Sequence, residues 1–279
     1  MLFQPLVKWI GSKRQQSEEI LNYFPSVMDT YYEPFCGGCS MLYQLLNSKE
    51  HYVGKYVVSD INPDLIDMLD IIKRNPNRML FEYTKLWNEM HSLETRQEKR
   101  RYYERVRRDF NKTRSPYLFF FLMRTCTNGI PRYNKKGNFN NTFHITREGV
   151  KPSRLKNMIF KWSRLFNENN VEFICCDYRQ IFDRVKAGDF LYLDPPYMMD
   201  RSTGRYFGKI DLTDLFDRLC VFKELGYRYC LSYDGPDGRA EYVPEACYDM
   251  KVEISSKNGG YRRTALKASP YATEILYVN

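Results

Sequence analysis

One short stretch, Asp194-Pro195-Pro196-Tyr197, combines an acid, two prolines and an aromatic residue directly after the apolar run Leu191–Leu193. This pattern predicts a buried parallel strand that ends in a rigid loop. Ligands of open α/β sheets bind beyond the carboxyl ends of the strands, so we expect the loop to lie where chemistry is done. The prolines fix φ and remove two backbone donors, which leaves carbonyls free to accept hydrogen bonds from a donor-rich substrate.

The tetrapeptide resembles the signature of amino-methyltransferases that act on an exocyclic nitrogen. The exocyclic amine of adenine is a poor nucleophile because its lone pair is delocalised into the ring. If Asp194 and a proline carbonyl accept its two N–H groups, the nitrogen becomes pyramidal and its lone pair points at a methyl donor. Tyr197 would then stack on the base. The alternative is an ordinary exit from a strand into a turn.

Two more predicted strand ends carry residues suited to a nucleoside. The strand that reaches Glu33 is followed by the glycine turn Gly37-Gly38, which lets a ligand approach the backbone closely. The turn is not G-x-G-x-x-G, so a dinucleotide pyrophosphate is not its natural occupant. The next strand ends in Asp60, where a ribose is held by its hydroxyls. Together these features suggest S-adenosylmethionine, although each acid alone is more often a helix cap.

The pattern along the chain predicts seven strands separated by helices, such as those over residues 15–23 and 212–225. The strands are expected near Tyr31–Glu33, Tyr56–Ser59, Val171–Cys176, Asp189–Leu193, Tyr227–Tyr233, Tyr248–Ile254 and Glu274–Val278. This order fits an α/β, doubly wound methyltransferase sheet. The interval from Asp60 to Val171 is far longer than one connection needs, so it must hold an inserted unit.

The positive charge is concentrated in that interval. The chain carries a formal net charge of +9, yet residues 96–164 hold 19 Lys and Arg against 4 Asp and Glu, and residues 115–147 contain no acid. Such a segment has the electrostatic footprint expected for phosphate binding. A solvated helix face is the competing interpretation for residues 96–114, where acids are interspersed.

Composition excludes several other classes. The sequence has no long uncharged apolar run and no basic-then-apolar leader, so we expect no membrane span or signal peptide and a cytoplasmic protein. The eight cysteines are interpreted as reduced core thiols. Cys36 and Cys39 form one C-x-x-C without a second pair at zinc-finger spacing, so no metal is predicted.

Taken in order, the motifs resemble those of Dam-type (D12 class, alpha group) DNA adenine-N6 methyltransferases. They are Lys8-Trp9 through Lys13, Glu33-Pro34-Phe35-x-Gly37, Asp60-Ile61-Asn62, residues 124–143, Asp194-Pro195-Pro196-Tyr197 and Ser256-Lys257-Asn258-Gly259-Gly260. The resemblance implies a class I methyltransferase sheet over residues 1–66 and 165–279. It also implies a mostly helical DNA target-recognition domain with a β-hairpin, inserted at residues 67–164.

The resemblance assigns site residues as well. It implies that Asp194, Pro195, Pro196 and Tyr197 are catalytic, and that Trp9, Lys13, Glu33, Phe35, Gly37, Asp60, Asp177 and Asp194 bind S-adenosylmethionine. Asp177 stands at the place of an acid that reads the adenine of the donor. The glycine loop departs from the family pattern at Cys39, where a third small residue is common.

The turn at Lys135-Lys136-Gly137-Asn138 has the chemistry of a β-hairpin, and a two-stranded ribbon fits the major groove. By resemblance, DNA is bound by Asn128, Ile130, Arg132, Tyr133, Asn134, Lys135, Asn141, Thr142, Lys257 and Asn258. Alternatively, Arg132 only grips phosphate. Thr142 departs from relatives that read GATC, which commonly carry proline at this position. The rest of the resemblance still favours GATC as the site.

The resemblance implies double-stranded DNA as partner, in a bacterial or phage-encoded enzyme that is a monomer or weak dimer. A cognate restriction endonuclease could act on the same site without a stable complex. Two other classes stay open. A non-catalytic DNA-binding protein has no reason to keep Asp194-Pro195-Pro196-Tyr197 intact. Methyltransferases of RNA or of protein amides do not require the basic insertion, and the amide enzymes typically carry Asn before Pro-Pro-Tyr.

Overall fold

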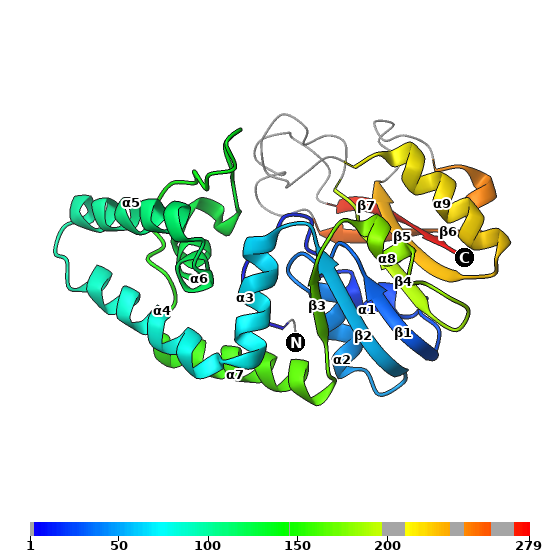
Figure 1. Cartoon of the computed structure of the whole chain (residues 1–279), viewed down its shortest axis with the longest axis horizontal. Coiled ribbons are helices and arrows are strands. Elements are labelled where there is room, and N and C mark those ends of the chain that lie inside the picture. Colours follow the sequence, from blue (N-terminus) through cyan, green and yellow to red (C-terminus); the bar gives the residue numbers. More distant parts are fainter. Residues whose placement is uncertain (1–2, 145, 197–209, 235–242, 258–270) are drawn as a thin grey trace.

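The computed structural model describes residues 3–144, 146–196, 210–234, 243–257 and 271–279. Within these residues a seven-stranded mixed sheet has the order β3-β2-β1-β4-β5-β7-β6 (Figure 1). Its strands are β1 (Val27–Glu33), β2 (Tyr52–Asp60), β3 (Glu172–Cys175), β4 (Phe190–Leu193), β5 (Arg228–Asp234), β6 (Met250–Lys257) and β7 (Tyr271–Val278). The first five run parallel, and β7 lies antiparallel between β5 and β6. All seven predicted strands are confirmed.

The sheet is doubly wound because its strand order reverses between β1 and β4. Strand β4 shows how both faces are covered. Phe190 and Tyr192 join one hydrophobic cluster together with α1 (Ser17–Leu21) and α2 (Ser40–Asn47). Leu191 and Leu193 join the second cluster, with α8 (Tyr178–Phe182) and α9 (Leu212–Glu224). Burial on both faces explains why this strand is a continuous apolar run.

The long interval after β2 forms a helical unit beside the β3 edge of the sheet (Figure 1). It contains α3 (Pro63–Arg74), α4 (Pro76–His91), α5 (Arg96–Thr113), α6 (Pro116–Thr125), the 3-10 turn η1 (Thr127–Gly129) and α7 (Pro152–Glu168). Proline starts four of these helices, where its missing N–H costs nothing. Thr95 and Glu98 form a capping box that starts α5.

Aromatic residues join the helical unit to the sheet. Trp162 of α7 is 1% exposed, packs edge-on against Phe3 and at a tilt against Tyr43, and donates its indole N–H to the Gln4 carbonyl at 3.1 Å. One hydrophobic cluster therefore continues from the sheet into the helices. Truncation of such a buried tryptophan to alanine typically costs about 3–5 kcal/mol.

The cysteine prediction was wrong for one pair. Cys220 of α9 and Cys247 of the short 3-10 turn η3 (Glu245–Cys247) form a disulfide, while the other six cysteines are free thiols. Five of these six are buried as expected, but Cys175 is exposed and is not a core thiol. The contact between α9 and η3 is tertiary, so the 27-residue separation of the pair carried no signal in the sequence. Among the described residues, no helix is both long enough and apolar enough to cross a membrane.

Candidate active site

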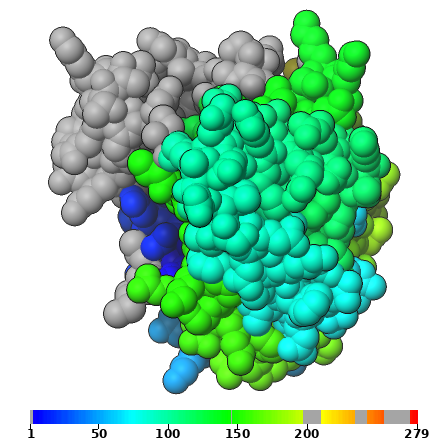
Figure 2. Space-filling model, turned by 90° about the vertical axis from the view of Figure 1, so that its left-hand side faces the viewer, coloured from blue at the N-terminus to red at the C-terminus, as the bar shows by residue number. Residues whose placement is uncertain are grey.

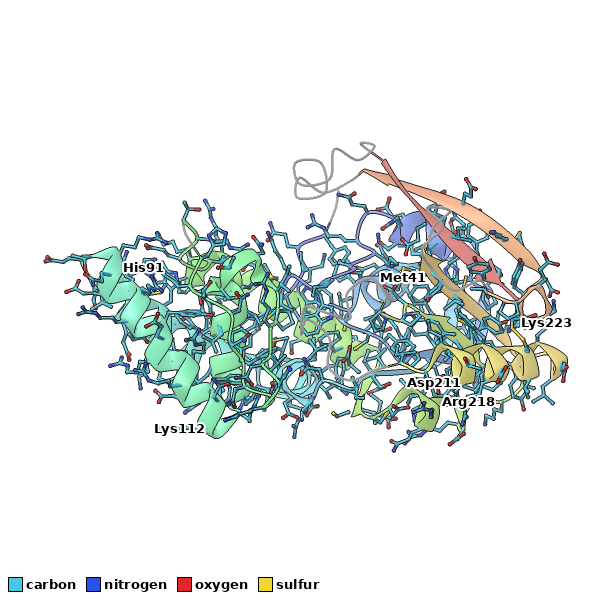
Figure 3. The ribbon with its side chains drawn as sticks, turned by 90° about the horizontal axis from the view of Figure 1, so that it is seen from above. Met41, His91, Lys112, Asp211, Arg218 and Lys223 are labelled. Atoms are coloured by element: carbon cyan, nitrogen blue, oxygen red, sulfur yellow. A yellow bond between two sulfur atoms is a disulfide. The ribbon has the colours of Figure 1, made fainter. Side chains whose placement is uncertain are left out.

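A pocket lies at the carboxyl ends of the parallel strands. The eight residues predicted to bind a methyl donor all line it: Trp9, Lys13, Glu33, Phe35, Gly37, Asp60, Asp177 and Asp194. Met41, another lining residue, lies in Figure 3 between the helical unit, labelled at His91 and Lys112, and α9, labelled at its N-cap Asp211 and at Arg218 and Lys223. The fold thus gathers side chains that are up to 185 positions apart in sequence.

Asp60, the last residue of β2, is held by backbone donors. Its Oδ1 accepts the N–H of Asn62 at 2.9 Å and its Oδ2 accepts the N–H of Gly37 at 3.2 Å. Burial raises the pKa of Asp60 to about 6, although these backbone N–H groups act in the opposite direction. Asn62 then caps α3 by accepting from the Asp64 N–H. The carboxylate is therefore fixed toward the pocket.

The glycine turn is shaped around Trp9. Gly37 has φ +45°, and a Cβ at this position would come within 2.6 Å of the indole Cδ1. Only glycine fits this approach without moving the ring. Cys39, the position that departs from the resembled pattern, is fully buried with φ 56° and precedes α2. A small side chain is accommodated there in a left-handed conformation.

Glu33 ends β1 inside the pocket. The phenol of Tyr31 donates to its carboxylate at 2.8 Å. Burial raises the pKa of Glu33 to about 8, and the nearby charge of Asp194 adds to this increase, against the Tyr31 hydrogen bond. Glu33 is thus a buried acid whose pKa lies well above its usual value.

The ammonium of Lys13 lies between two carboxylates. Its Nζ is 2.7 Å from Asp194 Oδ1 and 2.5 Å from Glu274 Oε1. Burial alone would lower the pKa of Lys13, but the charges of Asp194 and Glu274 outweigh it and raise the pKa above its usual value. Glu274 was not among the predicted site residues. An acid inside an otherwise apolar strand was the available signal, since unpaired acids are rarely buried.

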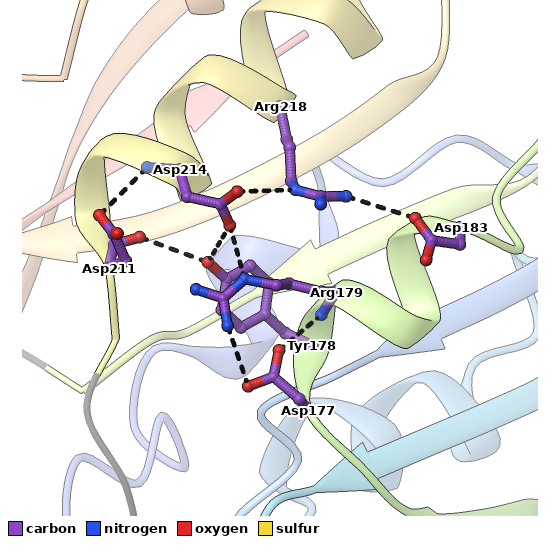
Figure 4. A network of polar contacts seen from close by, with 7 residues as sticks. All are labelled: Asp177, Tyr178, Arg179, Asp183, Asp211, Asp214 and Arg218. Carbon is purple, nitrogen blue, oxygen red and sulfur yellow. Dashed lines mark hydrogen bonds and ion pairs between the residues drawn. The ribbon is translucent and has the colours of Figure 1, made fainter.

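Asp177 caps α8 by accepting the Arg179 N–H at 3.0 Å. The next residue, Tyr178, lines the pocket and donates to Asp214 at 2.7 Å (Figure 4). Asp214 also receives Arg179 Nε at 2.9 Å and Arg218 Nε at 3.1 Å. Burial would raise the pKa of Asp214, but these three donors lower it to about 2. The network ties the two helices on this face together next to Asp177.

The predicted hairpin is an antiparallel loop with two isolated bridges, Cys126 to Phe143 and Tyr133 to Phe139, and not a pair of regular strands. Asn134 forms the turn: its side chain accepts N–H groups of residues 136 and 138. Side chains of the helical unit donate hydrogen bonds to loop carbonyls that would accept backbone N–H groups in a regular sheet. One of them is Arg107, which donates to the Asn141 carbonyl. Competition from these side-chain donors explains the short ladder.

The predicted DNA-binding residues of the loop divide by exposure. Asn128, Asn134, Lys135 and Thr142 are exposed, Ile130 and Arg132 are half-buried, and Tyr133 and Asn141 are buried. The Asn141 amide donates to the carbonyls of Thr127 and Ile130 at 2.9 and 2.7 Å. In this structure Asn141 therefore shapes the loop. Direct base contact by it stays a prediction.

The tip of the loop is fastened to α3. Tyr133 donates to Asp64 Oδ2 at 2.8 Å, and Asn62 donates to the same phenol at 3.4 Å. Arg114 reaches Asp64 with one nitrogen at 3.2 Å and the Gly137 carbonyl with another at 2.6 Å. Asn62, which lines the pocket, and the tip of the loop thus belong to one hydrogen-bond network.

Some predicted residues lie at or beyond the described parts. Tyr197 and Asn258 fall outside the described residues, and Lys257 is the last residue of β6. Within the described residues, no group of three or more His, Cys, Asp and Glu side chains is arranged to hold a metal ion.

The strand order and a pocket lined by Asp194, Pro195 and Pro196 are those of an α/β methyltransferase. Residues 9–219 match the family model described as D12 class N6 adenine-specific DNA methyltransferase. The chain belongs to this family, as the resemblance implied. It is an S-adenosylmethionine-dependent DNA adenine-N6 methyltransferase.

The relatives include type II methyltransferases and DNA adenine methylases. Type II methyltransferase M.MjaIII of Methanocaldococcus jannaschii is 34% identical over 77% of this chain and 76% of its own length. The DNA adenine methylase of Haemophilus influenzae is 30% identical over 70% of this chain and 64% of its own. Type II methyltransferase M1.LlaDCHI of Lactococcus lactis subsp. cremoris is 26% identical over 99% of this chain and 95% of its own length.

The pocket residues fit the methyl donor that the family implies. Gly37 lets the turn backbone approach the Trp9 ring closely, and Asp60 accepts the N–H of this glycine at the pocket wall. Three acids line the pocket: Glu33 at the end of β1, Asp60 at the end of β2 and Asp177 after β3. Such acids suit the hydroxyls, the amine and the positive charge of a nucleoside sulfonium. S-adenosylmethionine supplies the methyl group when it is bound.

Proposed function

We propose that this enzyme methylates the N6 amine of an adenine that is flipped out of a short duplex sequence, with GATC as the favoured site. The observation that carries the proposal is the position of Asp194. It follows β4 at the pocket wall, 2.7 Å from the buried Lys13 ammonium and beside the residues suited to the donor. An adenine can reach this wall only outside the base stack.

The donor-binding roles follow from position. Asp60 accepts the ribose hydroxyls, and Asp177 accepts the adenine amine of the donor. Trp9, Phe35, Gly37, Lys13 and Glu33 would hold its methionine and sulfonium parts. Glu33 is buried and Asp60 is half-buried, which supports this assignment because a carboxylate shielded from water attracts a cation more strongly.

The transfer itself depends on the Asp194 loop. Asp194 and the Pro195 carbonyl accept the two N–H groups of the target amine, Pro196 keeps the loop rigid, and Tyr197 stacks on the base. An N–CH3 bond forms, the S–CH3 bond breaks, and the methylated amine loses one proton to water. No metal takes part in this scheme, so activity should persist in EDTA.

Target reading is assigned to the inserted unit, residues 67–164, and catalysis to residues 1–66 and 165–279. Arg132 is the main candidate for guanine, since it is a half-buried arginine of the loop and an arginine can bind guanine through two acceptors. Asn128, Ile130 and Thr142 read neighbouring bases. Asn134, Lys135, Lys257 and Asn258 add further DNA contacts, and Tyr133 and Asn141 shape the loop.

The face of the helical unit supports DNA binding. Helices α4 and α5 form the surface toward the viewer in Figure 2, and α5 exposes six basic residues, namely Arg96, Arg100, Arg101, Arg105, Arg108 and Lys112. We place the enzyme in a bacterial or phage-infected cytoplasm, as a monomer or weak dimer. A restriction endonuclease that shares the site is a further expected partner.

The test identifies both the base and its context. Purified protein is incubated with S-adenosylmethionine and a plasmid duplex, and the product is digested to nucleosides and also sequenced for modified bases. We expect N6-methyladenine at one short sequence. N4-methylcytosine, or methylation of hairpin RNA in preference to duplex DNA, would contradict the proposal.

A further inference from the structure

Glu274 lies in the sheet beneath the catalytic loop, on the strand that runs antiparallel to β5 and β6. It pairs with Asp234 in the register of β5 and with Ile254 in that of β6. Its side chain is 8% exposed, and its Oε1 is 2.5 Å from the Lys13 ammonium. Since Lys13 also contacts Asp194, one cation joins this strand to the catalytic loop.

The Glu274 carboxylate is fixed on both oxygens. Gln16 Nε2 donates to Oε2 at 2.8 Å, and Ser232 Oγ donates to Oε1 at 3.0 Å. Gln16 is 8% exposed and Ser232 is fully buried, so water does not compete for these bonds. Such a buried, hydrogen-bonded carboxylate cannot follow Lys13 if the lysine moves. It therefore sets the position of the ammonium.

The charges of this group matter for the chemistry. Two carboxylates share one ammonium, so an ionised group of Lys13, Asp194 and Glu274 keeps one net negative charge. Gln16 and Ser232 are neutral and leave this balance unchanged. If Glu274 were neutral, the positive charge of Lys13 would be balanced by Asp194 alone. Asp194 would then be a weaker acceptor for the hydrogens of the target amine.

We propose that Glu274 is a positioning residue for methyl transfer, which holds Lys13 and through it orients Asp194 toward the target amine. This inference rests on the proposed role of Asp194. Positioning errors of about 1 Å at a reacting group can cost about 10²-fold in rate. Glu274→Gln preserves shape and removes the charge, so we expect its single-turnover methylation rate constant at saturating donor to fall about 10- to 100-fold.

Two measurements and two further variants separate positioning from a structural role. Affinity for S-adenosylhomocysteine, measured by calorimetry, and the melting temperature should stay near those of the parent enzyme. The matched control is Glu253→Gln, an exposed acid on β6 opposite Ile275, which should leave the rate constant unchanged. In a Lys13→Gln background, Glu274→Gln should have little further effect, because it acts through the lysine.

A normal rate constant for Glu274→Gln would overturn the inference. So would an equal loss of rate when Glu274→Gln is introduced into the parent enzyme and into the Lys13→Gln variant. Parallel losses of rate, S-adenosylhomocysteine affinity and melting temperature would assign Glu274 a structural role and overturn it as well. Failure of the proposed function looks different, because the parent enzyme itself would then form no N6-methyladenine in duplex DNA.

Discussion

The phenol of Tyr133 donates a 2.8 Å hydrogen bond to the carboxylate of Asp64. This bond fastens the loop that is proposed to read DNA to the first turn of α3, two residues after the Asn62 cap. The donor pocket and the DNA-reading loop therefore share a common support, which explains how one helix start can position both.

Tyr133→Phe tests this support. Removal of the hydroxyl deprives a buried acid of one donor and should lower the free energy of unfolding by about 1–3 kcal/mol. The kcat/KM for cognate duplex should fall while S-adenosylhomocysteine affinity stays unchanged. Tyr52→Phe is the control, because Tyr52 is 71% exposed. Equal kcat/KM values for the two variants would show that the bond does not position the loop.

Asp60→Ala should weaken donor binding. A ribose hydroxyl that loses a charged acceptor costs about 1.5–3 kcal/mol, whereas DNA binding does not use this carboxylate. Calorimetry with S-adenosylhomocysteine and a DNA-binding titration measure the two effects separately. Unaltered donor affinity would leave Asp60 only its structural bonds to Gly37 and Asn62.

Donor affinity should rise with pH. Asp60, with a pKa of about 6, and Glu33, with a pKa of about 8, are protonated below these values in the free pocket. A cationic donor favours the ionised forms, so protons leave on binding. Affinity should therefore fall by up to about tenfold per pH unit below pH 8, where Glu33 is protonated, and more steeply below pH 6, where Asp60 is protonated as well. Asp60→Asn should remove the additional dependence below pH 6. A flat profile from pH 5 to 9 would contradict donor contact by these acids.

Arg132→Ala and Lys135→Ala should have different effects on specificity. Loss of a base-reading arginine should relax discrimination at one guanine by about 1–3 kcal/mol. Loss of the exposed Lys135 should weaken binding to all sequences alike and lower its salt dependence. Methylation rates on cognate and single-mismatch duplexes distinguish the two. If Arg132→Ala reduced both rates equally, Arg132 would contact phosphate only.

The sequence predicted the parts of the molecule that depend on local pattern. Apolar runs such as Leu191–Leu193 located the strands, and acids directly after them, such as Asp60, located the pocket. Glu274 was missed because its importance comes from a tertiary contact with Lys13. The disulfide of Cys220 was missed for the same reason, and the expected ribbon is short because side chains such as Arg107 hold its carbonyls.

The measurement that tests the central claim most directly compares Asp194→Ala with the parent enzyme in N6-methyladenine formation on duplex DNA. Asp194 is proposed to accept hydrogens from the target amine, and loss of one such preorganised group costs about 10²–10³-fold in rate. We expect that loss in the single-turnover rate constant, with the fold retained by circular dichroism. Near-normal turnover by a folded Asp194→Ala variant would contradict the account.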